Sequence, residues 1–133
     1  MKTSELRIGN IINYEATTHI VKGIKEDIVY SYWHKDDRRL DLFGSHISEH
    51  KPIKITEEWL LKLGFNKCNY KTVYHAPNST IFLLNGRAVK HYKRQDVEYF
   101  RMVREDVNIK YIHELQNLVF ALTGVELTAE PAR

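Results

Sequence analysis

The chain has 133 residues, 43% hydrophobic and 28% charged, and this balance excludes an intrinsically disordered polypeptide. No apolar run approaches the roughly 20 residues that cross a bilayer, and the N-terminus MKTSELRIGN lacks the apolar core of a signal peptide. The single cysteine, Cys68, allows neither an internal disulfide nor a thiolate zinc site by itself. We therefore expect a cytoplasmic protein that forms a single domain over residues 1–133.

The net charge of +3 is unevenly distributed along the chain. Residues 59–95 contain no aspartate or glutamate but seven lysines and arginines, whereas the flanking residues 1–58 and 96–133 are both slightly acidic. A stretch of this kind produces a local positive potential unless other segments neutralise it in the fold.

The first half of the chain predicts a β-meander that leads into a helix. Short runs of β-branched and aromatic residues alternate with turn-rich breaks, which favours a small curled sheet or an SH3-like barrel. A helix is expected at about residues 57–63, because Thr56 can cap its N-terminus and Gly64 can end it. The runs are Leu6–Tyr14, His19–Lys25, Ile28–Trp33 and Leu40–Phe43.

The second half repeats this plan. Asn85-Gly86 lies between two apolar runs and is typical of a two-residue hairpin turn. A last short strand is expected at Ile109–Tyr111, directly before the C-terminal helix. The other expected strands are Tyr70–His75, Thr80–Leu84, Arg87–Tyr92 and Val97–Val103.

A second amphipathic helix is predicted at about residues 112–123, with Gly124 as a left-handed C-cap. Its expected apolar stripe consists of Tyr111, Ile112, Leu115, Leu118, Val119 and Leu122. Its expected polar side, either solvated or in contact with a partner, consists of His113, Glu114, Gln116 and Asn117. The fold class is therefore α+β with antiparallel pairing, in which residues 1–65 and 66–128 form two similar halves and residues 129–133 fray.

Basic and aromatic residues are interleaved between positions 87 and 101. Such a surface can neutralise phosphates and stack bases, as in proteins that hold single-stranded nucleic acid. Strand alternation is equally compatible with a solvated hairpin whose arginines face water. The candidate contacts are Arg87, Lys90, Tyr92, Lys93, Arg94, Tyr99 and Arg101.

The segment His46-Ile47-Ser48-Glu49-His50 matches H-x-x-E-H, a zinc-binding pattern of one metallopeptidase group. That chemistry needs both imidazoles on one face of a helix, with the glutamate beside them to activate water. Gly44-Ser45 before the motif and Lys51-Pro52 after it leave too little room for such a helix. The sequence therefore favours a polar loop over a metal site made by His46, Glu49 and His50.

Two further groups of residues have an alternative structural interpretation. Tyr14, Tyr30, Tyr32 and Trp33 could line a recognition groove of the SH3 type, or they could complete the core of the barrel. The loop that holds Asp36, Asp37 and Asp41 also holds basic residues that oppose cation binding. No phosphate-binding loop, nucleophile elbow or Cys/His zinc spacing is present, so we expect no cofactor and no enzymatic activity.

Three blocks of the sequence resemble a group of small uncharacterised proteins encoded in Bacteroidetes genomes and in their phages or mobile elements. The blocks are LRIGNIINY, ITEEWLLKLGF and KYIHELQNLVFALTGVEL, and together they span most of the chain. The resemblance implies a bacterial or phage cytoplasmic context and a mobile-element role, but it assigns no functional residues.

Three functional hypotheses follow from these observations. The first is a non-enzymatic binding or adaptor protein that contacts a protein partner, and a homodimer is compatible with it. The alternative is a module that binds nucleic acid or nucleotides through the basic 59–95 segment. The third, a metal-dependent hydrolase built on the H-x-x-E-H motif, is the weakest.

Overall fold

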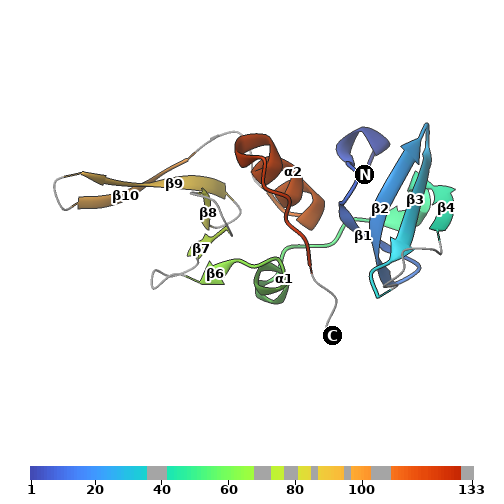
Figure 1. Ribbon diagram of the computed structural model, residues 1–133, viewed down its shortest axis with the longest axis horizontal. Helices are drawn as coiled ribbons and strands as arrows, with labels where there is room; N and C mark the ends of the chain where they lie inside the picture. Colours follow the sequence, from blue (N-terminus) through green and yellow to red (C-terminus); the bar gives the residue numbers. More distant parts are fainter. Residues whose placement is uncertain are drawn as a thin grey trace.

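Two five-stranded antiparallel sheets and two α-helices account for most of the described chain, which confirms the α+β class (Figure 1). The computed structural model describes residues 1–35, 42–67, 73–76, 81–84, 87–94, 97–102 and 109–129. Figure 1 shows helix α2 between the two sheets along the long axis of the molecule.

The N-terminal sheet has the strand order β4-β3-β2-β1-β5. The first four strands form a meander, and β5 returns to pair with β1 through Tyr14 and His50. This gives the curled antiparallel sheet expected from the short strands, whereas an SH3-like barrel stays a prediction. The elements are β1 (Ile11–Tyr14), β2 (Thr17–Lys25), β3 (Ile28–Trp33), β4 (Leu42–His46), the 3-10 turn η2 (Ile47–Glu49) and β5 (His50–Lys51).

The first strand is shorter than predicted. Thr3–Glu5 form a 3-10 turn, and the next residues turn again, because the Asn10 side chain accepts a hydrogen bond from the Arg7 amide at 2.6 Å. Extended pairing therefore begins at Ile11 instead of Leu6.

The two faces of the N-terminal sheet contribute to different cores. One face closes a small core with Leu6, Ile12, Val21, Val29 and Ile47. The opposite face contributes Ile11 to a larger core beneath the helices, and Ile20 packs against that core. The larger core also includes Leu60, Leu63, Phe65, Ile112, Leu115, Val119 and Leu127.

Both predicted helices are present with their expected caps. Helix α1 spans Glu57–Lys62, and its Thr56 hydroxyl accepts a hydrogen bond from the Trp59 amide at 3.2 Å. Helix α2 spans Ile112–Thr123 and ends at Gly124, whose φ of +75° is the left-handed conformation that glycine adopts without strain.

The expected strand at Ile109–Tyr111 is wrong. Tyr111 makes one isolated bridge to Lys54, and the chain then enters α2, where the Ile112 amide donates to the Ile53 carbonyl at 2.8 Å. The backbone partners available here are the few residues that precede α1, which are too few for a regular ladder.

The second sheet is a meander with the order β10-β9-β8-β7-β6. Leu84 pairs with Arg87, so the connection between β8 and β9 is the predicted Asn85-Gly86, which lies outside the described residues. The strands are β6 (Asn66–Lys67), β7 (Val73–His75), β8 (Ile81–Leu84), β9 (Arg87–Arg94) and β10 (Val97–Met102).

Candidate nucleic-acid interface

The β9–β10 hairpin carries all seven residues predicted to contact nucleic acid. β9 extends to Arg94, two residues beyond the predicted end at Tyr92, and the two strands pair without interruption from Val97↔Arg94 to Met102↔Val89. Lys90 lies opposite Arg101, and Tyr92 lies opposite Tyr99.

The register sorts these residues onto two faces, because directly opposed residues share a face and successive residues alternate. Five of the seven share one face, which we call the basic face: Lys90, Tyr92, Arg94, Tyr99 and Arg101. Arg87 and Lys93 belong to the opposite face, where Lys93 lies opposite Glu98. The structure therefore brings most of the predicted contacts together and separates two of them.

The two faces of the hairpin differ in charge. Glu98 is the acidic residue of the two strands, and it lies opposite a lysine on the other face. The basic face has three cations and no acid, and two of these cations, Lys90 and Arg101, are a directly opposed pair. Like charges in that position destabilise a sheet. A polyanion bound at this face would offset the repulsion.

The hairpin projects from the body of the molecule (Figure 1). The basic face continues across β8 to β7, where it carries Tyr74, which packs against the larger core. β8 pairs with β9 only as far as Lys90. From His91 to Arg94, the pairing recorded for β9 is with β10 alone.

Elsewhere in the acid-free stretch, positive charge is partly neutralised. Lys62 lies 3.1 Å from Glu58 across one turn of α1, and Lys67 lies 3.3 Å from Glu57. Both acidic residues precede the stretch in sequence, and α1 places them beside these lysines. The strands of the hairpin carry five basic residues, Arg87, Lys90, Lys93, Arg94 and Arg101, and one acidic residue, Glu98.

The H-x-x-E-H segment does not have the geometry of a zinc-binding helix. Ile47–Glu49 form a single 3-10 turn, and the His46 ring lies at the surface, where Nδ1 accepts a hydrogen bond from the Ser48 amide. His50 begins β5 and is buried, with Nε2 2.7 Å from the Ser45 hydroxyl. Within the described residues, no group of three or more His, Cys, Asp or Glu side chains is arranged to hold a metal ion.

A cluster of aromatic and histidine rings, which the sequence analysis did not identify, lies on one face of the N-terminal sheet. Tyr14 stacks on His50 at 5.0 Å between centroids and meets His19 edge-on at 5.2 Å, while Phe43 lies 5.5 Å from His19. The His19 Nδ1 is 3.0 Å from the Ser31 hydroxyl. Burial lowers the pKa of both histidines, and their mutual repulsion lowers the pKa of His19 further.

Of the two interpretations of Tyr14, Tyr30, Tyr32 and Trp33, a groove lined by all four is wrong, because these residues divide between the two faces of the sheet. Tyr14 and Trp33 share the face of His19. Tyr30 and Tyr32 lie on the other face, where the Tyr30 ring covers Gly44 so closely that an added Cβ would lie 2.7 Å from it.

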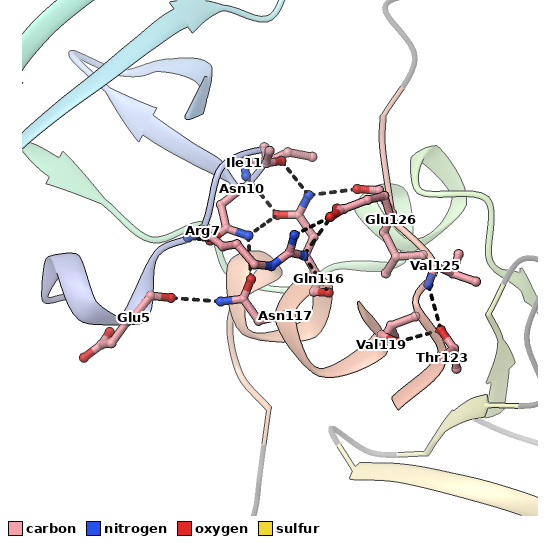
Figure 2. A network of polar contacts seen from close by, with 12 residues as sticks. Glu5, Arg7, Asn10, Ile11, Gln116, Asn117, Val119, Thr123, Val125 and Glu126 are labelled. Carbon is pink, nitrogen blue, oxygen red and sulfur yellow. Dashed lines mark hydrogen bonds and ion pairs between the residues drawn. The ribbon is translucent and has the colours of Figure 1, made fainter. Parts of the chain in front are cut away.

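The polar side of α2 is also different from the prediction, because Gln116 is fully buried (Figure 2). Its carbonyl oxygen accepts from the Ile11 amide at 2.8 Å, and its amide nitrogen donates to the carbonyls of Gly9 and Leu127 at 3.0 and 2.8 Å. These backbone groups have no partner in a regular β-ladder, so the side chain of Gln116 provides their hydrogen bonds.

The same network extends to the surface (Figure 2). Asn117 donates to the Glu5 carbonyl at 2.8 Å, and Arg7 forms an ion pair with Glu126 while its guanidinium lies 4.1 Å above the Phe120 ring. The network joins the N-terminal segment, α2 and the segment after it. Most of its polar groups are engaged with one another, with Arg7 Nε an exception within the described residues, so it is a structural junction.

His113 belongs to the same buried side of α2, which corrects the expectation that it is solvated. It is 1% exposed, and no described residue offers a hydrogen-bond partner to either ring nitrogen. The Glu5 carboxylate lies 3.9 Å from Nε2, and the ring stacks on Tyr111. Burial is the main cause of a lowered His113 pKa.

Comparison with family models, curated proteins and solved structures found no match. Neither helix in the described part of the chain has the length and apolar character needed to cross a membrane.

Proposed function

We propose that this protein is a non-enzymatic binding module whose β9–β10 hairpin binds nucleic acid through the basic face. The observation that carries the proposal is the register of the hairpin, because it places three cations and two tyrosines on one face and the acid Glu98 on the other. Phosphate contacts dominate nucleic-acid affinity, and they require exposed cations with no competing carboxylate.

The like-charged pair Lys90 and Arg101 supports this assignment. Such a pair reduces the stability of the free hairpin. A phosphate group between two opposed cations would replace their repulsion with two charge-assisted hydrogen bonds. The loss of stability caused by this repulsion in the free protein would then be offset in the complex.

The test is a fluorescence-polarisation titration with labelled oligonucleotides at about 50 and 200 mM salt. Binding should weaken steeply at the higher salt concentration, because each neutralised phosphate releases a counterion. The double variant Lys90→Glu/Arg101→Glu should abolish binding and leave the circular dichroism spectrum unchanged.

Lys93→Glu/Arg87→Glu is the matched control, because it makes the same change of charge at two positions of β9 on the opposite face of the hairpin. This variant should retain most of the affinity. Equal loss in both double variants would show a nonspecific effect of net charge and would contradict an interface on the basic face.

A second candidate function is protein binding, and one observation favours it. Trp33 and Phe43 lie on neighbouring strands of the N-terminal sheet, on the face of the histidine cluster, and they are 43% and 45% exposed. Exposed aromatic residues close together are common in protein interfaces. Under this proposal, Trp33→Ser/Phe43→Ser would abolish binding of a protein partner, as measured by co-purification. If the unmodified protein is a homodimer, the same variant would be a monomer by light scattering.

The cellular context belongs to the same proposal. The resemblance of three sequence blocks to proteins of Bacteroidetes and their phages or mobile elements supports a role in the bacterial cytoplasm. Nucleic acid of the host or of the mobile element would be accessible there.

A further inference from the structure

Two tyrosines occupy the centre of the basic face. Tyr92 lies directly opposite Tyr99, the Lys90–Arg101 pair lies two residues along the strands on one side, and Arg94 lies two residues along on the other. Two residues of a strand span about 7 Å, and neighbouring strands are about 4.8 Å apart. Along the hairpin, the basic face therefore has first the Lys90–Arg101 pair, then the two tyrosines and then Arg94.

This alternation distinguishes between forms of nucleic acid. In a duplex each base is covered by its neighbours, so phosphates are accessible to a protein but the flat faces of the bases are not. In a single strand the bases can separate and stack on aromatic side chains, while the phosphates between them contact cations. Cations alone would serve both forms, whereas a central tyrosine pair adds affinity for unpaired bases.

We infer that the ligand of the basic face is single-stranded nucleic acid, with one unpaired base stacked on Tyr92 and a second on Tyr99. Lys90, Arg94 and Arg101 hold the adjoining phosphates. This inference rests on the proposed function and narrows it to one class of ligand.

The number of cations sets an expected salt dependence. Each phosphate neutralised on a single strand contributes about −0.7 to the slope of log affinity against log salt concentration, so three cations give a slope of about −2. Replacing Arg94 with glutamine should reduce the magnitude of the slope by about 0.7 and weaken the binding of all sequences alike.

The first experiment uses the unmodified protein. A labelled oligonucleotide of about 12 nucleotides and the blunt duplex of the same sequence are titrated by fluorescence polarisation, since sites for single strands usually cover about 4–16 nucleotides. We expect the single strand to bind at least about ten times more tightly, from the stacking of two bases. This comparison needs no variant and is independent of any effect of mutation on folding.

The second experiment replaces the tyrosines. Tyr92→Leu and Tyr99→Leu should each weaken single-strand binding by about 5- to 150-fold, which is the range measured for loss of one stacked base. Tyr92→Phe and Tyr99→Phe should restore most of that affinity, because phenylalanine retains the aromatic ring. His91→Leu, on the opposite face of the same strand, is the control and should bind normally.

The outcomes separate the inference from the proposal on which it rests. Equal affinity for single strand and duplex, or leucine variants that bind the single strand normally, would overturn the single-strand inference and leave nucleic-acid binding intact. Failure of the unmodified protein to bind either oligonucleotide at about 50 mM salt would overturn both.

Discussion

Gln116 makes hydrogen bonds to two separated parts of the chain, although a glutamine expected on the polar side of an amphipathic helix usually faces water. Its side chain bonds to the Gly9 carbonyl and to the amide of Ile11, the first residue of β1, and also to the carbonyl of Leu127 after α2. Since its side chain is fully buried, loss of these bonds leaves polar groups with no access to solvent.

The substitution Gln116→Leu is therefore expected to destabilise the protein by about 3 kcal/mol or more, since each buried polar group left unpaired costs about 1–3 kcal/mol. The measurement is the free energy of unfolding from urea titration. Asn117→Leu is the neighbouring control and should cost about 1 kcal/mol, because its side chain is only half-buried. A Gln116→Leu protein as stable as the original would contradict the structural role of the network.

The three buried histidines predict a dependence of stability on pH. Burial holds the pKa of His19, His50 and His113 below their ordinary 6.5, so the unfolded chain binds protons that the folded chain does not. The stability that these neutral histidines contribute is fully present above about pH 6.5, the pKa of the unfolded chain. It is lost as the pH falls through their lowered pKa values in the folded protein. Urea midpoints at about pH 7.5 and 5.5 should show lower stability in acid.

His113→Phe tests one part of this effect, because within the described residues neither ring nitrogen of His113 has a hydrogen-bond partner. Its charged neighbours are Glu5 and Glu114, which favour protonation, and the N-terminal amine, which opposes it. The variant should lose less stability between the two pH values than the original protein. A midpoint that rises in acid would contradict the account.

At the scale of single elements, the β1–β2 hairpin has a backbone conformation that its sequence does not favour. Tyr14 pairs with Thr17 across a two-residue turn, and the turn residues Glu15 and Ala16 have φ of +49° and +61°. Positive φ at both positions is the geometry for which Asn-Gly is preferred. A residue with a Cβ costs about 1–2 kcal/mol in this region.

Ala16→Gly should therefore stabilise the protein, by about 0.5–1 kcal/mol after the greater entropy of glycine in the unfolded chain is subtracted. Thermal unfolding followed by circular dichroism measures the change. Ala121→Gly, at an exposed position of α2, is the opposite control and should destabilise the protein by about 1 kcal/mol. A lower melting temperature for Ala16→Gly would contradict the assigned strain.

The elements that could be predicted from the sequence are those specified by neighbouring residues. Thr56 and Gly124 determine where α1 begins and α2 ends through contacts within four residues, and both were predicted. The Glu15-Ala16 turn has no local signal, so the predicted gap between strands was too wide. Gln116 was assigned to the wrong environment because its partners at Gly9 and Ile11 are more than 100 residues away.

The candidate interface was predicted in composition but not in geometry. Interleaved cations and tyrosines identified seven residues, yet alternation within one strand cannot show which residue of the next strand lies opposite. The pairing of Lys90 with Arg101 supplies that information and moves Arg87 and Lys93 to the other face. Strand register depends on the loop between the strands and on the packing of the sheet, so the residue pattern of a single strand could not predict it.

At the scale of the whole molecule, the hairpin with five basic residues and one acid projects at the far side from the N-terminal sheet (Figure 1). Nearer the body of the molecule, α1 supplies Glu57 and Glu58 to Lys67 and Lys62. α2 and its buried network join the N-terminal sheet to the larger core. The hairpin is therefore the basic element that extends from this joined body.

The most direct test of this account is an amide chemical-shift titration by NMR, with a single-stranded oligonucleotide added to the isotope-labelled protein. We expect shifts concentrated at Lys90–Arg94 and Val97–Arg101, with the amides of the N-terminal sheet unchanged. Shifts confined to β3 and β4, or no shifts at saturating oligonucleotide, would contradict the assignment of the hairpin as the binding element.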